Sequence, residues 1–327
     1  MSTTIRDITS ADIERVIEFD RRLTGSARRN YHEKRMAAAN AEPASFITIA
    51  AFDGQTLQGY AFAHVLDGEF GGAGPVGVME TIGVDPDLRG NGLGRKLMAA
   101  VEDALRKRGI KEIVTQADWT EHPITRFFQS AGFELAPRLV LERATGNTSD
   151  FDAPLAQQVR DSDEVDLSDP SGDDFAALSR DRVPVRSLTE ADFPFIVSID
   201  RKVMRRDRSG YYKRKISEVT KETGVRVSLV AEVDGLFAGF VMARTEYGEF
   251  GRAHATAILD TIGVDPANAG QNVGRALMSQ LLTNLSSLGV EKVQTQVAWN
   301  SFELLQFLAR CGFVPSQRLS FWRRLDE

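Results

Sequence analysis

Three glycines at alternate positions, flanked by two arginines, form the segment of this chain with the clearest chemical potential. The run is Arg89-Gly90-Asn91-Gly92-Leu93-Gly94-Arg95. Glycine lets a backbone turn tightly and approach a ligand without a Cβ clash. The amphipathic stretch that follows predicts a helix whose first N–H groups and positive dipole end face the same space. Together with the arginines, these features predict a site for phosphate or pyrophosphate. A plain turn is the alternative, because a glycine-rich loop alone is weak evidence.

An altered copy of this segment occurs 180 residues further along the chain. The hexapeptide Thr-Ile-Gly-Val-Asp-Pro at 81–86 returns at 261–266, and the loop after it reads Ala269-Gly270-Gln271-Asn272-Val273-Gly274-Arg275. Ala269 stands where the first copy has Arg89, which removes a phosphate contact. Asn272 replaces Gly92 and adds a side chain where a phosphate would lie. We therefore expect the second copy to bind an anion poorly or not at all, and to have a structural role.

The same offset relates the two halves of the chain over most of their length. Gly68-Glu69-Phe70-Gly71, for example, pairs with Gly248-Glu249-Phe250-Gly251. A chain of 327 residues suits about two domains of roughly 150 residues, and only two copies are too few for a solenoid. The predicted division is an N-terminal domain at 1–143, an acidic linker at 144–182 and a C-terminal domain at 183–327. The linker could also wrap around one domain.

Hydrophobic periodicity and turn signals predict the same order of elements in each half, β-α-α-β-β-β-α-β-α-β-β, and hence a mixed α/β fold. Ser10 is the expected N-cap of the first helix, and Gly109 is expected to end the third. In the first half the predicted strands are 5–8, 46–52, 57–66, 76–84, 111–117 and parts of 133–143, and the predicted helices are 10–20, 29–39, 92–108 and 123–131.

The combined motifs resemble those of the GCN5-related N-acetyltransferases, the GNAT family. They are Val84-x-Pro86-x-x-Arg89-Gly90-x-Gly92-x-Gly94 and, further along, Phe127-Phe128-x-x-x-Gly132-Phe133. The resemblance covers nearly all of each half, element order included. It implies two tandem GNAT-like domains, each a mixed, largely antiparallel sheet flanked by helices. It also implies acetyl-CoA-dependent transfer to a primary amine.

The family's way of binding coenzyme A assigns the cofactor contacts. Its loop binds the pyrophosphate, which the resemblance places on the backbone N–H groups of Arg89, Gly90, Asn91, Gly92, Leu93, Gly94 and Arg95. The pantetheine arm lies beside the fourth strand like an added strand, which implicates the backbone at Ile82, Gly83 and Val84. One of these N–H groups would also stabilise the tetrahedral oxyanion. Acetyl-CoA is therefore the expected cosubstrate.

Two positions depart from the family's pattern. Members often have a tyrosine after the helix phenylalanine, as general acid for the leaving thiolate, but this position is Phe128 here and Leu308 in the second half. The asparagine that is frequent near the start of this helix is Glu121 and Ser301. Another group or water then protonates the thiolate, or the thiolate leaves as an anion. His122 could do so or act as a base, and a surface histidine is the alternative.

Glu80 is the candidate general base. A lysine-like amine has a pKa of about 10.4 and must lose a proton before it attacks. Period-two alternation predicts that Glu80, Ile82 and Val84 share one face of a strand, so that the carboxylate points into the coenzyme A groove. Asp260 occupies the equivalent position in the second half. The alternative is a salt bridge to a nearby Arg or Lys, since a buried carboxylate needs a partner.

Four residues are candidate contacts of the amine acceptor: Arg28, Tyr31, Glu69 and Phe70. The first two lie in a basic region that recurs in the second half and that lines the acceptor site in the resembling family. An acceptor with a carboxylate or phosphate is one hypothesis; a solvated helix face, or a surface that holds the acidic linker, are the alternatives. Glu69 and Phe70 could contact the amine or shape a glycine-flanked turn.

Composition excludes several classes of protein. The net charge of −6 argues against general nucleic-acid binding, and no apolar run reaches membrane-spanning length. The N-terminus lacks an apolar signal core, so the cytoplasm is the expected compartment. The single cysteine, Cys311, is expected to be a buried thiol. No metal is expected, since no cluster has metal-ligand spacing. His64 and His254 do not align between the halves, which weakens a functional role for either.

The sequence therefore predicts a tandem N-acetyltransferase. Its N-terminal domain would transfer acetyl directly to a small-molecule or peptide amine, without an acyl-enzyme. The rival is a non-catalytic acyl-CoA-binding or interaction module, which the absent tyrosine favours. A monomer with pseudo-dimeric halves and a homodimer both fit. The sequence does not identify the acceptor.

Overall fold

Two compact units make up the structure, each built on a seven-stranded sheet. The first comprises residues 1–140, 247–254 and 316–327, and the second comprises 141–246 and 255–315. The linker predicted at 144–182 lies outside the described residues from 147 onward, and so do Glu69 and Phe70. The computed structural model describes residues 3–25, 27–67, 74–146, 183–221, 226–247 and 255–326.

The elements of the first repeat agree with the predicted ones to within a few residues. The first helix begins differently, because a capping box between Thr9 and Asp12, and not Ser10, starts the 3-10 turn before it. In chain order the elements are β1 (Thr3–Asp7), η1 (Ser10–Asp12), α1 (Ile13–Thr24), α2 (Arg29–Ala41), β2 (Phe46–Asp53), β3 (Thr56–Asp67), β4 (Pro75–Val84), η3 (Pro86–Leu88), α3 (Leu93–Lys107), β5 (Glu112–Asp118), α4 (His122–Ser130), β6 (Glu134–Leu135) and β7 (Arg138–Ala144).

The second repeat has the same order of elements, as its sequence predicts. Thr189 and Asp192 repeat the capping box. The elements are β8 (Val185–Ser187), η5 (Glu190–Asp192), α7 (Phe193–Met204), α8 (Ser209–Lys221), β9 (Arg226–Val233), β10 (Leu236–Tyr247), β11 (Ala255–Val264), η7 (Pro266–Asn268), α9 (Val273–Ser287), β12 (Lys292–Ala298), α10 (Phe302–Arg310), β13 (Val314–Pro315) and β14 (Arg318–Arg324).

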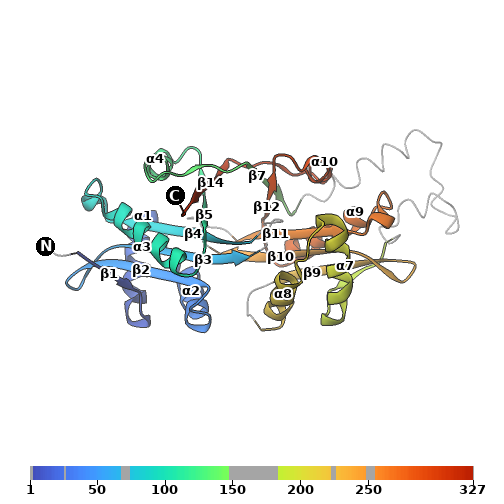
Figure 1. Cartoon of the computed structure of the whole chain (residues 1–327), viewed down its shortest axis with the longest axis horizontal. Helices are drawn as coiled ribbons and strands as arrows, with labels where there is room; N and C mark the ends of the chain where they lie inside the picture. The colour runs from blue at the N-terminus through green and yellow to red at the C-terminus, as the bar shows by residue number, and fades with distance from the viewer. Residues whose placement is uncertain are drawn as a thin grey trace. The chain divides into compact units, whose positions relative to one another are not determined.

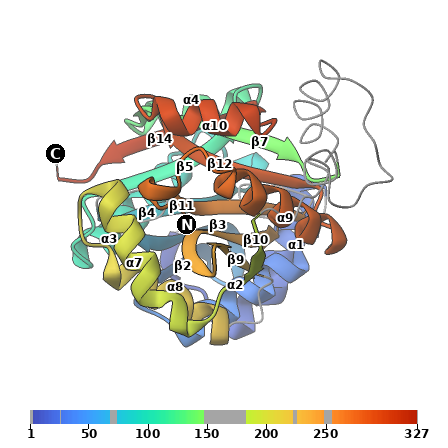
Figure 2. The same ribbon diagram turned by 90° about the vertical axis from the view of Figure 1, so that its right-hand side faces the viewer.

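Both sheets are mixed, which confirms the predicted fold class. The first has the order β1-β2-β3-β4-β5-β14-β6, and the second has the order β13-β7-β12-β11-β10-β9-β8. In the first sheet β4 and β5 are parallel and the other neighbours are antiparallel. In the second, β11 and β12 form the corresponding parallel pair. Figures 1 and 2 label most strands of the two sheets.

The last strand of each repeat lies in the sheet that the other repeat begins. β14, drawn in red in Figure 1, lies between β5 and β6, and it runs antiparallel to β5 from Arg318 opposite Asp118 to Arg324 opposite Glu112. β7 lies between β12 and β13 in the second sheet. The predicted domains, 1–143 and 183–327, place β7 in the first domain and β14 in the second. In the structure β7 lies in the second sheet and β14 in the first, so the two strands are exchanged.

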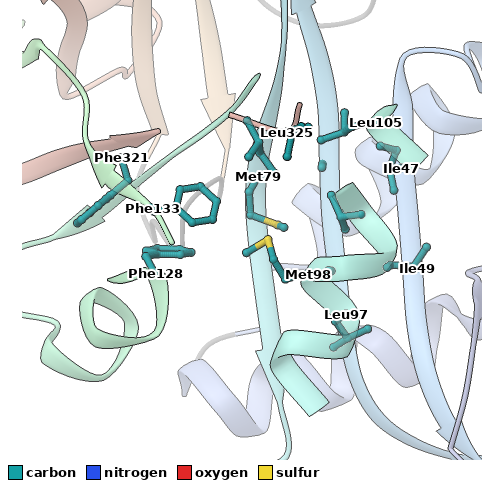
Figure 3. Close-up of a cluster of buried hydrophobic side chains, with 14 of the residues drawn as sticks. Ile47, Ile49, Met79, Leu97, Met98, Leu105, Phe128, Phe133, Phe321 and Leu325 are labelled. Carbon is teal, nitrogen blue, oxygen red and sulfur yellow. The ribbon is translucent and has the colours of Figure 1, made fainter. Parts of the chain in front are cut away.

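One face of the first sheet is covered by α3 (Figure 3). The predicted apolar stripe of this helix is confirmed, since Leu97, Val101 and Leu105 are fully buried. They belong to one buried cluster with Ile47 and Ile49 of β2, Met79 of β4 and the aromatic side chains of Phe128, Phe133 and Phe321. The C-terminal strand therefore contributes to the core of the first unit as well as to its sheet.

The opposite face is covered by α1 and α2, with a buried ion pair at its centre. Asp20 of α1 is fully buried, and it accepts hydrogen bonds from Arg28 Nε at 2.8 Å and from the Tyr60 hydroxyl at 2.5 Å. His32 Nε2 lies 3.1 Å from the same carboxylate. Burial would raise the pKa of Asp20, but hydrogen bonds from Arg28, His32 and Tyr60 outweigh it and lower that pKa well below its usual range. The ion pair fixes the connection between the two helices.

Replacement of Asp20 by Asn is expected to destabilise the first unit by about 3–5 kcal/mol, because it removes the carboxylate that is bound to the buried Arg28 guanidinium. Urea unfolding followed by circular dichroism measures this loss. Glu18→Gln is the matched control on the same helix: it removes the exposed Glu18–Arg21 pair, which should change stability little. Equal effects of the two variants would show that Asp20 is not a structural ion pair.

Acid should weaken the first unit through the same carboxylate. The pKa of Asp20 in the folded protein lies below that of an unfolded aspartate, about 3.9. Its contribution to stability is therefore present above that value and is lost as the pH falls below it. Unfolding free energies measured between about pH 6 and 3 should decline less steeply for Asp20→Asn than for the wild type.

Candidate active site

The glycine loop after β4 forms an open cradle at the start of α3. Gly90 and Gly92 have φ values of +84° and +78°, and open space lies where their Cβ atoms would be. Lys96 N–H donates to Gly92 O in the first bond of the helix, so the N–H groups of Leu93, Gly94 and Arg95 precede any intrahelical acceptor. Arg89 and Arg95 are exposed. This geometry suits an anion, as the sequence predicts.

The third glycine of the loop has a different task. A Cβ at Gly94 would lie 3.1 Å from the Phe127 ring of α4, so the absence of a side chain lets this ring pack against the start of α3. Gly274 and Phe307 repeat the arrangement, with a distance of 3.0 Å. Gly90 and Gly92 therefore shape the cradle, and Gly94 allows α4 to pack against the start of α3.

The second loop keeps the backbone of the first and differs in its side chains. Gly270 has a φ of +81°, and Asn272, which replaces Gly92 as the N-cap of the helix, has a φ of +62°. Asparagine tolerates this left-handed conformation better than most residues. The loss of an arginine at Ala269 and the added amide of Asn272 are thus the changes at the second cradle, as the sequence predicts.

Strands β4 and β5 separate at the end from which the cradle follows. In the described part of the chain their parallel ladder consists of Gly77 with Ile113 and Val78 with Val114. The Thr115 hydroxyl then donates to the Met79 carbonyl at 2.9 Å, and beyond this bond β4 continues without β5 to Val84. The backbone edge of β4 near Ile82, Gly83 and Val84 can therefore accept an added strand.

A β-bulge at Glu80 corrects the predicted direction of this side chain. Phe62 of β3 pairs with Thr81, and Ala63 pairs with Met79, so Glu80 is the extra residue. Ile82 and Val84 pack in the core under α3, whereas Glu80 contacts α2 on the opposite face. The expectation that Glu80 points the same way as Ile82 and Val84 is wrong, because a bulge interrupts period-two alternation and re-aims a side chain.

Glu80 is the centre of a buried charge cluster. Its side chain is fully buried; Arg35 Nη2 lies 2.6 Å from Oε1, His64 Nδ1 contacts the same oxygen, and the Tyr31 hydroxyl donates to Oε2 at 2.8 Å. Burial alone would raise the pKa of Glu80, but the nearby Arg35 and His64 and the hydrogen bonds from His64 and Tyr31 lower it overall. The salt bridge considered as the alternative is therefore present. The role of Glu80 as a base stays a prediction.

The second unit contains a matching cluster with different cations. Asp260 lies 3.5 Å from Lys215 Nζ and contacts Arg244. By the repeat offset, Lys215 corresponds to Arg35 and Arg244 corresponds to His64. The sequence comparison treated His64 as an unmatched histidine and so missed that both positions hold a basic group beside the strand carboxylate.

The other predicted site residues lie in two different settings. Arg28 is 7% exposed and bound to Asp20, which leaves little of it for an acceptor, and Tyr31 donates to Glu80. Phe128, at the family's tyrosine position, is buried against Phe133 and Phe321 and so supports the core. His122 is exposed at the start of α4.

Three further predictions concern a metal site, membrane-spanning helices and the single cysteine. Among the described residues no group of three or more His, Cys, Asp and Glu side chains could hold a metal ion. No helix in the described ranges is long and apolar enough to cross a membrane. Cys311 is buried, and burial raises the pKa of its thiol to about 11, which makes it a poor nucleophile.

Comparison with models of protein families identifies the family of this chain. The model of the acetyltransferase (GNAT) family matches residues 13–133 and, a second time, residues 186–313. The chain belongs to the GNAT family. The resemblance drawn from its motifs is thereby confirmed for both repeats. Each match ends before the exchanged strand of its repeat.

Two relatives align with parts of this GNAT protein. An aminoglycoside N(6')-acetyltransferase type 1 of Stenotrophomonas maltophilia is 32% identical over 142 residues, which are 43% of this chain and 92% of the relative. A mycothiol acetyltransferase of Thermobispora bispora is 37% identical over 78 residues, which are 24% of this chain and 26% of the relative. The match to the mycothiol acetyltransferase thus spans about a quarter of that protein.

A solved structure has the same tandem fold. A tandem GNAT protein from the clavulanic acid biosynthesis pathway superposes on this one with a TM-score of 0.64 and 13% sequence identity, and the alignment covers 99% of each chain. Identity this low shows the shared fold alone. It supports the interpretation of the chain as two GNAT-like domains.

Proposed function

We propose that this protein is an acetyl-CoA-dependent N-acetyltransferase and that its first unit carries the active site. One observation carries the proposal: the open cradle of Gly90, Gly92 and the free N–H groups of α3 directly follows the part of β4 that β5 leaves unpaired. The cradle fits a pyrophosphate, and the free strand edge fits the amides of a pantetheine arm. Both features lie on one stretch of chain from Ile82 to Arg95.

Each part of this stretch has a separate task. The N–H groups of Leu93, Gly94 and Arg95, with the positive end of α3, hold the pyrophosphate, and the arginines at 89 and 95 add charge. The backbone at Ile82, Gly83 and Val84 holds the pantetheine arm and donates to the oxyanion. When bound, acetyl-CoA supplies the acyl thioester that an amine attacks. Direct transfer forms no acyl-enzyme and therefore needs no cysteine nucleophile. Cys311 is buried.

The acceptor belongs to the class of primary amines on small molecules or peptides. The aminoglycoside relative supports an amine on a small molecule, because the alignment covers 92% of it. The acceptor region would lie on the α1 and α2 side of β4, where Glu80 and His64 are found.

Titration calorimetry with acetyl-CoA tests the proposal first. We expect one site per chain, since the second cradle lacks an arginine and carries Asn272. Release of the coenzyme A thiol is then measured with a panel of free amines that includes an aminoglycoside with a 6′-amine. Binding without amine-dependent thiol release would support the non-catalytic acyl-CoA-binding module. If acetyl-CoA does not bind, both the N-acetyltransferase and the acyl-CoA-binding module are contradicted.

A further inference from the structure

We propose that His64 accepts the proton of the attacking amine through Nε2 and that Glu80 is its positioning residue. This inference rests on the proposed acetyl transfer and deepens it. His64 lies on β3 opposite Val78 of β4, next to the bulge at Glu80, after which β4 continues without β5. The proposal places the amine on the α2 side of β4, beside this imidazole.

The contact with Glu80 defines the state of the imidazole. His64 Nδ1 is buried against Glu80 Oε1. A lone pair on Nδ1 would repel a carboxylate oxygen, so the proton of the neutral ring lies on Nδ1 and leaves the lone pair on Nε2. A tenth of the side chain stays exposed, and because Nδ1 is buried this surface belongs to the rest of the ring. Nε2 has no partner among the described residues.

The groups packed around His64 are charged, polar and aromatic. Arg35 Nη2 lies 2.6 Å from Glu80 Oε1 and balances its charge. Tyr31 from α2 donates a hydrogen bond to the carboxylate, and Phe46 from β2 stacks on the ring with a centroid distance of 6.0 Å. Glu80 can stabilise the imidazolium that forms when Nε2 accepts a proton, because the carboxylate already contacts Nδ1–H.

The second unit shows the same cluster without a proton acceptor. Asp260 is held by Lys215 and Arg244, and an arginine at the position of His64 cannot be deprotonated in a protein. The histidine therefore occurs in the unit with the arginine-flanked glycine loop and is absent from the unit with the altered loop. A purely structural cluster would be served equally well by either side chain.

The proton and the electrons balance in the proposed step. The ammonium group of the acceptor gives one proton to His64 Nε2, and the free amine nitrogen then forms a bond to the acyl carbon of the thioester. The tetrahedral intermediate collapses, the carbon–sulfur bond breaks, and the thiolate leaves with the electron pair and takes up the second proton that the nitrogen loses. The imidazolium returns its proton to solvent. Glu80 stays ionised throughout and holds the ring by Nδ1–H.

Replacement of His64 by Arg is the decisive test, because the chain itself shows that Arg fits beside a carboxylate at this position. We expect His64→Arg to fold and to bind acetyl-CoA as the wild type does. Its kcat/KM for the amine should fall by about 10²–10⁴, the usual contribution of a general base. Arg244→His, the matched exchange in the second unit, should leave kcat/KM unchanged.

The dependence of this loss on pH separates proton transfer from a structural role. The defect of His64→Arg and of His64→Gln should shrink as the pH approaches the pKa of the amine, because a free amine needs no base. A loss that is equal at every pH, or activity close to that of the wild type, would overturn the role of His64 and leave the acetyltransferase function intact. A wild-type protein without amine-dependent thiol release would overturn both.

A second measurement needs no turnover. Nitrogen NMR of labelled histidine should show the neutral ring of His64 protonated on Nδ1, and Glu80→Gln should alter that signal. The opposite tautomer in the wild type, with the proton on Nε2, would contradict the proposal even if the enzyme is active.

Discussion

Removal of residues 316–327 is expected to abolish the cooperative unfolding of one of the two units. β14 fills the position between β5 and β6, and its loss removes seven register pairs with β5 from Arg318 to Arg324. It also removes Phe321 and Leu325 from the core under α3 and the Arg323–Glu102 ion pair. A domain is stable by only about 5–15 kcal/mol, and Phe321→Ala alone should cost about 3–5 kcal/mol.

Hydrogen exchange followed by mass spectrometry measures this loss along the chain. We expect protection to disappear from β5 and α3 of the truncated protein. If β7 moves from the second sheet to replace β14, protection should disappear from β12 instead, because one strand cannot complete two sheets. Removal of Asp326 and Glu327 alone is the control and should change nothing. Full protection of both units in the truncated protein would contradict the exchange of strands.

The exchange shows where inference from the sequence ends. Helices and strands were predictable, because α3 has its apolar stripe and glycines follow the helices at the expected places. β7 and β14 both begin with Arg-Leu and have similar alternation. A local pattern states that a strand forms and which face is apolar, but not which of two equivalent sheets it joins.

The candidate site was predictable to the same degree. The cradle follows from three glycines and a helix start, which are local signals. The segment Met79-Glu80-Thr81 contains no Gly or Pro that would indicate the bulge at Glu80. Period-two alternation therefore predicted the wrong face for this side chain. The partners of Glu80 come from α2 and β3. Only the repeat offset could have suggested them, through the basic residues at both 64 and 244.

Replacement of Gly92 by Glu is expected to raise the Kd for acetyl-CoA by at least about 100-fold, which corresponds to about 2.7 kcal/mol. The space at the Cβ position of Gly92 is open and lies at the N-terminus of α3. A carboxylate there would occupy the place of a phosphate and repel it, and the positive φ of Gly92 adds backbone strain for any side chain at this position. Calorimetry measures the Kd, and a thermal melt checks the fold.

The second cradle provides the control and the reverse experiment. Asn272→Glu places a carboxylate at the equivalent position, and it should leave the Kd unaltered if the first cradle is the site. Equal losses in both variants would show that both loops bind. The pair Ala269→Arg and Asn272→Gly gives the second loop the side chains of the first on a backbone that already has the left-handed φ. A second acetyl-CoA site in that variant would mean that the side chains at 269 and 272 alone account for the difference in binding between the two cradles. If none appears, the difference lies beyond the loop, and the strand edge of β11 becomes the next place to exchange residues.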